Sequence, residues 1–358
     1  MNRENLLELN EEVTRYFVED EVNEVHPSDI IAFNELRSCA DLLRMHTRGQ
    51  LDIQPDYQRN FIWNNAAQGR FIDSLVKQLP IPSICITLDY KTDRRQVVDG
   101  LQRISTIIRF LSDDKWRIPN LPDIHPDLAG NSVSSVRKNS PAIIDRVENT
   151  TIPVTVLRCD LSRREHEEYI FTIFHRLNTG GATLSNQEIR NCIYSGPLND
   201  MLKKFVVSEV YQAIFPSKSS SYRFLEEEKV LRILALSTVK YKSPLSRFLN
   251  TYMSDQRNLN DDELIAIYDR LYQVYDRFRI IVNKDSTTLI SNTIAEACLI
   301  GLYVNLDFVL SLEDQEVFKR WVKLISSPPL RPDQLKEGLS HTDSLNARIE
   351  AAKEAFSS

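Results

Sequence analysis

The sequence predicts an α+β protein in which a mixed α/β core is followed by an all-helical domain. Segments with the apolar, β-branched character of strands lie in the first part of the chain, at 84–90, 95–99 and 151–160. Beyond the break at Gly196-Pro197, the patterned segments have helical periodicity. This change predicts three parts: a peripheral segment over 1–34, a core domain over 35–195 and a helical domain over 196–358.

The composition is that of a globular protein, with 358 residues of which 42% are hydrophobic and 26% are charged. The net charge of −6 argues against a surface coated in basic residues, so charge does not indicate DNA as a partner. Five dispersed cysteines without a C-x-x-C pair predict reduced core thiols and neither a disulfide framework nor a zinc site. The polar N-terminus does not resemble a signal peptide, and the apolar segment "AEACLIGLYV" is shorter than the about 20 residues that span a bilayer. We therefore expect a cytoplasmic protein without a membrane partner.

The elements of the core follow from the pattern in order along the chain. Residues 1–30 are acidic and predict a peripheral helix with a connector. Residues 38–49 predict a helix with Ser38 as its N-cap and Gly49 as its stop signal. Residues 51–63 predict an extended segment that Pro55 interrupts, and the apolar spacing in 66–80 predicts a second helix.

A β-hairpin is predicted next, because "ICITLDY" and "RQVVD" flank the polar turn "KTD". A helix then begins at Leu101, with an apolar stripe at 101, 104, 107, 108 and 111. Residues 112–150 are rich in Pro, Asn, Ser and Asp and predict a long loop or insertion. A strand over 151–160 and a helix, loop and helix over 162–195 complete the predicted core.

Three polar motifs interrupt these elements, and the second, "DGLQRIST" at 99–106, has the clearest chemistry. A glycine before a helix lets a ligand approach the backbone, and the unpaired N–H groups of the helix start attract phosphate. Arg103 can hold two phosphate oxygens, Ser105 and Thr106 add hydroxyls, and Asp99 can hold Arg103, a metal ion or a water. The alternative is an ordinary helix start in which Asp99 is the cap and Arg103 is solvated.

The first and third motifs each allow two interpretations. In "DYQRNFIW" at 56–63, Gln58 and Arg59 can face a ligand beside an aromatic wall of Tyr57 and Trp63. Alternatively the two aromatic residues are core and Arg59 is a surface ion pair. In "FHRLNTGGATLSNQEIRN" at 174–191, the glycines permit a close ligand approach or simply a turn between helices. Its "SNQE" predicts a capping box that opens a helix ending near Gly196.

Together and in this order, the three motifs resemble the N-terminal domain family of GmrSD-type modification-dependent restriction enzymes. The family includes SspE- and BrxU-type phage-defence proteins, and its signature is similar to Y-Q-R-x-x-x-W, D-G-Q-Q-R and F-x-R-L-N-T-G-G. Helical segments such as "FLEEEKVLRILAL" and "NARIEAAKEAF" also resemble the remainder of such domains. The resemblance covers roughly residues 35 to 356.

The resemblance implies a ParB/sulfiredoxin-like core that binds and hydrolyses a nucleoside triphosphate and thereby controls nuclease action on phage DNA. Its implied ligands are an NTP of unspecified base and Mg²⁺, with Asp99 as the metal ligand. The implied catalytic residues are Asp99, Gln102 and Arg103. The resemblance, together with the chemistry of the motifs given above, gives these candidate nucleotide-binding residues: Tyr57, Gln58, Arg59, Trp63, Gly100, Ser105, Thr106, Arg176, Asn178, Thr179 and Gly180.

Two departures from the family pattern change these expectations. Leu101 stands where the family has the first Gln of D-G-Q-Q-R, and its place in the apolar stripe predicts that it points into the core. The chain's six histidines show no H-N-H or D-H-x-x-P arrangement, which an HNH nuclease site requires. We therefore expect a nucleotide-handling module without its own HNH nuclease domain, which acts with a protein partner that supplies cutting or sensing and which can form a homo-oligomer.

Two other functions remain open from the sequence. One is a DNA-binding or DNA-nicking ParB-like protein, in which the arginines hold backbone phosphates. Binding of this kind weakens steeply with salt. The other is a protein-interaction module with a decayed nucleotide site, which the substitution at Leu101 favours and which nucleotide protection in a thermal melt would contradict.

Overall fold

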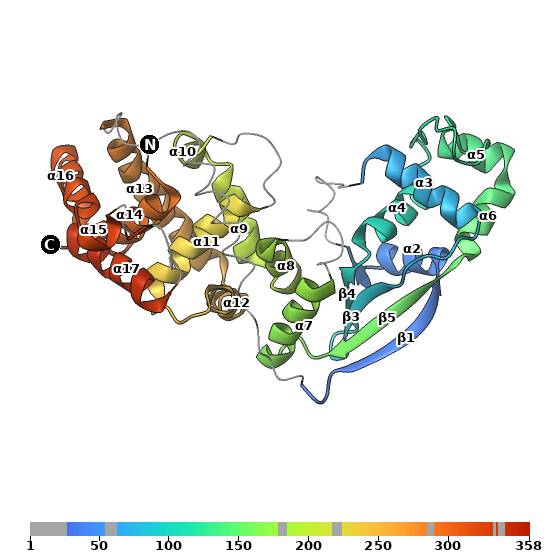
Figure 1. The fold of residues 1–358 in the computed structure, drawn as a ribbon, viewed down its shortest axis with the longest axis horizontal. Helices are drawn as coiled ribbons and strands as arrows, with labels where there is room; N and C mark the ends of the chain where they lie inside the picture. Colours follow the sequence, from blue (N-terminus) through green and yellow to red (C-terminus); the bar gives the residue numbers. More distant parts are fainter. Residues whose placement is uncertain are drawn as a thin grey trace. The chain divides into compact units, whose positions relative to one another are not determined.

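A computed structural model describes residues 27–53, 63–177, 185–216, 224–284, 290–331, 334–335 and 341–358. These residues fall into two compact units, of which one ends before Ser185 and the other begins there. The first unit contains a five-stranded sheet and the second is helical, so the predicted α+β class is confirmed. Figure 1 shows the elements of both units.

The sheet of the first unit has the strand order β1-β5-β3-β4-β2. β1 is antiparallel to β5, β5 parallel to β3, β3 antiparallel to β4 and β4 parallel to β2. The predicted hairpin is formed by β3 and β4, which Asp93 at φ 54° helps to connect. The strands are β1 (Ile31–Ser38), β2 (Leu51–Asp52), β3 (Ile84–Asp89), β4 (Arg94–Asp99) and β5 (Thr151–Cys159).

One face of this sheet is covered by five helices (Figure 1). Inward side chains of the strands, such as Ile86, Val97 and Val154, are buried with apolar residues of these helices in one core. The opposite face is covered in part by α7 (Arg164–Leu177), which contacts β4. The five helices are α2 (Cys39–Thr47), α3 (Asn65–Val76), α4 (Leu101–Ser112), α5 (Val133–Asn139) and α6 (Pro141–Asn149).

Local signals explain where these helices begin. Ser38 caps α2 by accepting a hydrogen bond from the Asp41 N–H at 3.1 Å, as predicted. Asn64 caps α3 in the same way. The apolar stripe of α4 faces the core, where Ile104 and Ile107 are fully buried. Leu101, at the start of the helix, is partly buried and packs against this core. The expectation that Leu101 points inward is therefore confirmed.

Two segments of the first unit differ from what the sequence suggested. Residues 112–150 were expected to form a long loop or insertion, but they include the helices α5 and α6, whose Ile143, Ile144 and Val147 are buried. These helices are short and separated by Ser140-Pro141. The turn-forming residues around them therefore dominate the sequence pattern and hide the apolar spacing of the helices. Residues 31–34, which the sequence placed in the peripheral segment over 1–34, form the first half of strand β1.

The second unit is helical throughout its described residues, and the break at Gly196-Pro197 lies between two of its helices. By its packing α8 groups with this unit, although the predicted domain boundary lies after it. The helices are α8 (Asn186–Ile193), α9 (Pro197–Val206), α10 (Glu209–Gln212), α11 (Leu225–Thr238), α12 (Leu245–Asp255), α13 (Asp261–Lys284), α14 (Asn292–Val304), α15 (Leu306–Leu310), α16 (Asp314–Ile325), the 3-10 helix η3 (Pro328–Leu330) and α17 (Thr342–Phe356).

The helix α14 is the centre of the second unit, since it contacts α11, α13 and α17 and is buried along most of its length. It contains the segment "AEACLIGLYV", which was too short to predict a membrane span. None of the described helices combines the length and the apolar character needed to cross a bilayer. All five cysteines of the chain are buried free thiols, as the sequence predicted.

Candidate functional site

The second motif forms the turn from β4 into α4, and Gly100 is the residue on which this turn depends. Gly100 has a φ of 92°, which side-chain-bearing residues rarely adopt. A Cβ added to it would also lie 2.4 Å from Cγ2 of Ile84, closer than atoms can approach. Both the conformation and the space therefore require glycine at this position.

The start of α4 carries no side-chain cap, because Gly100 occupies the N-cap position. The first bond within the helix runs from the Ile104 N–H to the Gly100 carbonyl at 3.0 Å. The N–H groups of Leu101, Gln102 and Arg103 precede it, and no hydrogen bond joins them to another described residue. These three donors and the positive end of the helix dipole are available to an anion.

Arg103 and Asp99 flank this helix start and bind each other. The Arg103 Nη2 donates to Asp99 Oδ2 at 2.7 Å, and its Nη1 donates to the carbonyls of Pro82 and Ser83 at 2.6 and 3.0 Å. Arg103 therefore ties α4 to the loop before β3, and it is not solvated as the alternative interpretation proposed. Asp99 is not the helix cap, and its Oδ1 has no hydrogen-bond partner among the described residues.

The thiol nearest to Asp99 is not a candidate nucleophile. Cys85 of β3 lies opposite Asp99 in the sheet and is buried. Burial, and to a smaller degree the charge of Asp99, raise the pKa of the Cys85 thiol to about 12. The thiol therefore stays protonated near neutral pH, and we assign it to the core.

The first and second motifs meet at Trp63 and Gln102. The Trp63 backbone N–H lies 3.4 Å from the Gln102 Oε1, and the Trp63 carbonyl accepts a hydrogen bond from Gln68 at 2.8 Å. The Trp63 ring packs edge-on against Phe71, with 5.3 Å between the ring centres. Tyr57, Gln58 and Arg59 lie outside the described residues, so their predicted roles stay predictions.

The two hydroxyl residues of the second motif differ in position. Ser105 is half-buried on the first turn and a half of α4. Thr106 is fully buried, and its hydroxyl donates to the Gln102 carbonyl at 2.7 Å. Its hydroxyl thus completes a bond within the helix, and we leave Thr106 out of the proposed site.

The third motif begins on α7, which contacts β4, and continues into α8 of the helical unit. Arg176 is exposed near the C-terminal end of α7. Asn178, Thr179, Gly180 and Gly181 lie outside the described residues. The predicted capping box is present at the start of α8, because Ser185 Oγ accepts from the Glu188 N–H and the Glu188 carboxylate accepts from the Ser185 N–H.

Arg190 of α8 was not singled out by its sequence, yet it forms a fully buried polar network. Its Nη1 donates to Glu228 of α11 at 2.9 Å, and its Nε donates to Asn250 of α12 at 2.8 Å. Burial lowers the pKa of Arg190, and the charge of Glu228 opposes this effect. The network fixes α8 within the helical unit. The sequence gives little sign of it, because the burial of Arg190 becomes visible only in the structure.

The Pro82 and Ser83 carbonyls that hold Arg103 were also missed, because backbone acceptors leave no signal in side-chain patterns. Among the described residues, no group of three or more His, Cys, Asp or Glu side chains gathers closely enough to hold a metal ion. Asp99 is thus the acidic side chain of the second motif that remains as a candidate ligand, and its predicted metal role stays a prediction.

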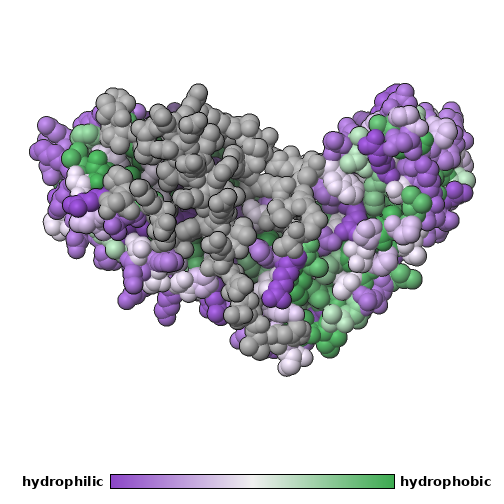
Figure 2. Space-filling model, in the orientation of Figure 1, coloured by the Kyte–Doolittle hydropathy of each residue, from purple (hydrophilic) through white to green (hydrophobic). Residues whose placement is uncertain are grey.

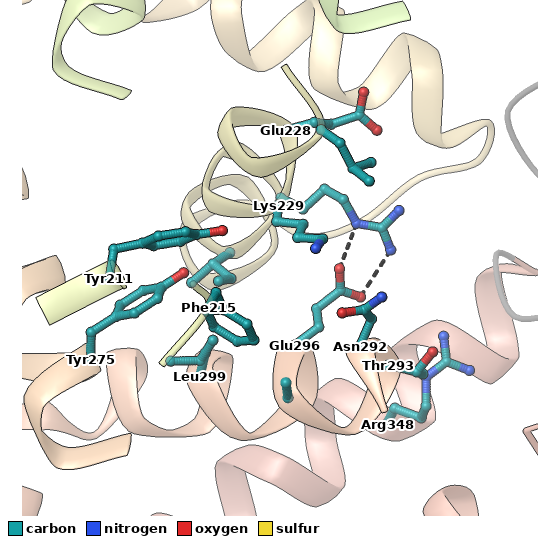
Figure 3. A pocket seen from close by; sticks show the side chains of 14 residues that line it. Tyr211, Phe215, Glu228, Lys229, Tyr275, Asn292, Thr293, Glu296, Leu299 and Arg348 are labelled. Carbon is teal, nitrogen blue, oxygen red and sulfur yellow. Dashed lines mark hydrogen bonds and ion pairs between the residues drawn. The ribbon is translucent and has the colours of Figure 1, made fainter. Parts of the chain in front are cut away.

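A separate pocket lies in the helical unit and contains none of the predicted site residues (Figure 3). Tyr211 and Tyr275 lie side by side at one end of it, with 5.5 Å between their ring centres. Away from the tyrosines lies Glu296, whose carboxylate accepts two hydrogen bonds from Arg232, of 2.5 and 2.9 Å. The positive charge of Arg232 is therefore balanced by the negative charge of Glu296 within the helical unit.

Comparison with known protein families matches residues 39–195 to the family described as GmrSD restriction endonuclease, N-terminal domain. Neither curated proteins nor solved structures give a match. The matched residues span all three motifs, from the start of α2 to the end of α8. The match indicates a module of a restriction-type phage-defence system. Residues 39–195 of this chain, which contain the three motifs, are thus similar to the GmrSD N-terminal domain family.

Proposed function

We propose that this domain binds a nucleoside triphosphate at the turn from β4 into α4 and hydrolyses it to control a nuclease. The observation that carries the proposal is the start of α4, where Gly100 leaves three backbone N–H groups uncapped beside Arg103 and Asp99. Other described helices, such as α9 with Gly196 at its N-cap, also start without a side-chain cap, but the start of α4 has the Arg103–Asp99 pair beside it. An uncapped start with an arginine beside it suits a phosphate group.

Different residues of the turn would contact the phosphates in different ways. The absent side chain of Gly100 allows close approach, and the N–H groups of residues 101–103 donate to phosphate oxygens. Arg103 is held in place by the Pro82 and Ser83 carbonyls, and its Nε and the second N–H of Nη2, which bond to no described residue, can donate to a ligand. Gln102 and Trp63 border the same turn.

Asp99 would hold Mg²⁺ or orient the attacking water through its Oδ1. A single carboxylate fits Mg²⁺, which is commonly bound by one or two carboxylates together with substrate phosphates and waters. When bound, Mg²⁺ supplies charge that offsets the negative charge on the phosphates. Arg176 and the predicted residues Gln58, Arg59, Asn178, Thr179 and Gly180 complete this proposal from the flanking motifs.

The proposed partner is a protein that cuts or senses DNA. This proposal is supported by the family match and by the histidines, which occur in no nuclease arrangement. Of these, His166 is buried and engaged with Asp29 and the Asp160 N–H. Nucleotide binding would favour one conformation of this chain, and a partner that binds this conformation better would respond to the nucleotide.

A thermal melt with each of the four NTPs, with and without Mg²⁺, tests nucleotide binding. A ligand at 100 times its Kd stabilises the folded state by about 2.7 kcal/mol, which is readily measured. We expect at least one NTP to raise the Tm, and Asp99→Asn to reduce the Mg²⁺-dependent part. Asp93→Asn is the matched control, because Asp93 lies at the other end of β4 on an exposed turn. No shift with any NTP would contradict the proposal.

The nuclease part is tested by incubating the pure chain with plain and modified phage DNA, divalent metal and each NTP. We expect no cleavage by the chain alone. Cleavage that persists through further purification and disappears in Asp99→Ala would show that the chain is itself the nuclease. A salt titration of DNA binding addresses the ParB-like alternative, since duplex affinity falls steeply with salt when arginines hold the backbone.

A further inference from the structure

The strand β1 leaves one edge of the sheet open (Figure 1). Its eight residues pair with β5 in continuous register, and no described strand lies on its other side. A strand edge of this length presents unpaired N–H and C=O groups that can accept another strand.

The register with β5 shows which backbone groups face outward. The Cys39 N–H donates to the Thr150 carbonyl at 3.0 Å, and this pair continues the β1–β5 register. In an antiparallel ladder, hydrogen-bonded and non-hydrogen-bonded pairs alternate. The odd-numbered residues of β1 therefore bond to β5, and Ala32, Asn34 and Leu36 direct their N–H and C=O groups to the open edge.

The side chains of β1 are unusually apolar for an open edge. Ile31, Phe33 and Leu36 are exposed by 50%, 39% and 69%. Natural edge strands are commonly protected by proline, a bulge or unpaired charges. β1 has no proline and no bulge in its register, and its charged Glu35 and Arg37 bond to each other. Figure 2 shows apolar side chains gathered over the region of β1 and β5.

We propose that β1 pairs with β1 of a second copy of this chain, antiparallel and centred on Asn34, so that two sheets become one. This register sets Ala32 against Leu36 of the second copy and Asn34 against its counterpart, which matches every outward-facing group of the three residues. A two-fold axis makes such a contact self-complementary.

Charge and side-chain chemistry select this register over its neighbours. Centring the pair on Glu35 would place two carboxylates directly opposite, which is unfavourable. Centring it on Phe33 would leave Leu36 without a hydrogen-bonding partner. In the proposed register Leu36 covers the small Ala32 of the second copy. The two Asn34 amides also meet. Among the described residues, the one partner of the Asn34 amide is Thr155, which donates to its Oδ1 at 2.9 Å, so Nδ2 can donate to the second copy.

The first test is the mass of the protein in solution, measured by sedimentation over a range of concentrations. We expect a dimer whose dissociation constant rises on the order of tenfold or more in Leu36→Lys and in Asn34→Pro. Proline at position 34 removes an N–H that faces outward and takes no bond from β5. Val207→Lys is the matched control, because Val207 is 72% exposed in the helical unit. Circular dichroism shows whether each variant is folded.

A cross-link tests the register. We expect Asn34→Cys to form a disulfide between copies, since directly opposite residues lie within disulfide distance. Leu36→Cys should not cross-link with itself, because its counterpart would lie about 14 Å away along the strand. The five native thiols are buried and do not compete. A monomer at every concentration, or a dimer that neither Leu36→Lys nor Asn34→Pro weakens, would overturn the proposal. Cross-linking of Leu36→Cys alone would overturn its register.

Discussion

Two arginine–carboxylate pairs have the same chemistry but differ in burial and in surroundings. Arg103 and Asp99 are 2.7 Å apart, with side chains 14% and 34% exposed. Arg190 and Glu228 are 2.9 Å apart and fully buried, with Asn250 as a further partner. The first pair lies at an uncapped helix start, and the second lies among packed helices.

This difference in burial distinguishes a pair that can bind a ligand from a pair that stabilises the fold. Breaking a buried ion pair is costly, since the charge that remains is left without a partner away from water. Arg190 and Glu228 are therefore read as structural. In the partly exposed pair, an Asp99 oxygen and donors of Arg103 that bond to no described residue lie where a ligand from solvent can reach them. The same contrast holds for the helix starts, because α8 has a capping box and α4 has none.

The largest expected effect is at the buried pair. Arg190→Met leaves the Glu228 carboxylate buried without its cation, which typically costs about 3–5 kcal/mol of unfolding free energy. Arg190→Met combined with Glu228→Leu removes both charges and should recover much of this loss. Chemical denaturation of both variants checks the expectation. If the single variant were as stable as wild type, the buried pair would not support the helical unit.

The next largest effect is expected for Gly100→Ala. The alanine must adopt an unfavourable backbone conformation, and its Cβ would clash with Ile84. Strain of this kind and overpacking each cost on the order of 1–3 kcal/mol. Gly49→Ala is the control, since Gly49 also has a positive φ but nothing lies within 4 Å of its added Cβ. We expect Gly100→Ala to lower the unfolding free energy clearly more than Gly49→Ala. Equal losses would show that the close packing against Ile84 does not matter.

A smaller loss of stability is expected for Arg103→Ala. The change leaves the Pro82 and Ser83 carbonyls and Asp99 without their donor, which costs about 1–3 kcal/mol. The same variant should weaken NTP binding by ten- to hundredfold, since it removes a charge-assisted contact to phosphate. Arg70→Ala is the control, because Arg70 pairs with Asp123 at the surface. Unchanged NTP affinity in folded Arg103→Ala protein would contradict the role given to Arg103.

The smallest expected effect is at the start of α8. Ser185→Ala removes one half of the capping box and should cost about 1 kcal/mol of stability. It should leave the NTP-induced rise in Tm unchanged, because the α8 cap serves the helix itself. A loss of the NTP effect would instead place the start of α8 within the nucleotide site.

The sequence predicted the elements with strong local signals. Ser38, the Ser185–Glu188 box and the stripe from Leu101 to Leu111 each depend on near neighbours, and the structure has all three. The helices α5 and α6 were missed because their turn-forming residues obscure short apolar repeats. β1 was missed because an edge strand with exposed apolar residues shows no alternation of buried and polar positions.

The candidate site was predictable in its residues but not in its bonds. The order of the three motifs identified Asp99, Gly100, Gln102 and Arg103, and the structure places them at one turn. The contacts of Arg103 with two carbonyls and of Gln102 with Trp63 join residues far apart in the chain. Contacts of this kind depend on tertiary packing, so a local pattern cannot reveal them.

The most direct test of the central claim is hydrogen–deuterium exchange with and without the NTP and Mg²⁺ that raise the Tm. The proposed site predicts slower exchange in peptides covering residues 100–104, where the uncapped N–H groups would bind phosphate. Peptides covering residues 186–189 should be unchanged, because the α8 cap already holds those groups. Protection that is absent from residues 100–104 but present around Arg232 and Glu296 would place the nucleotide in the helical unit and contradict the account.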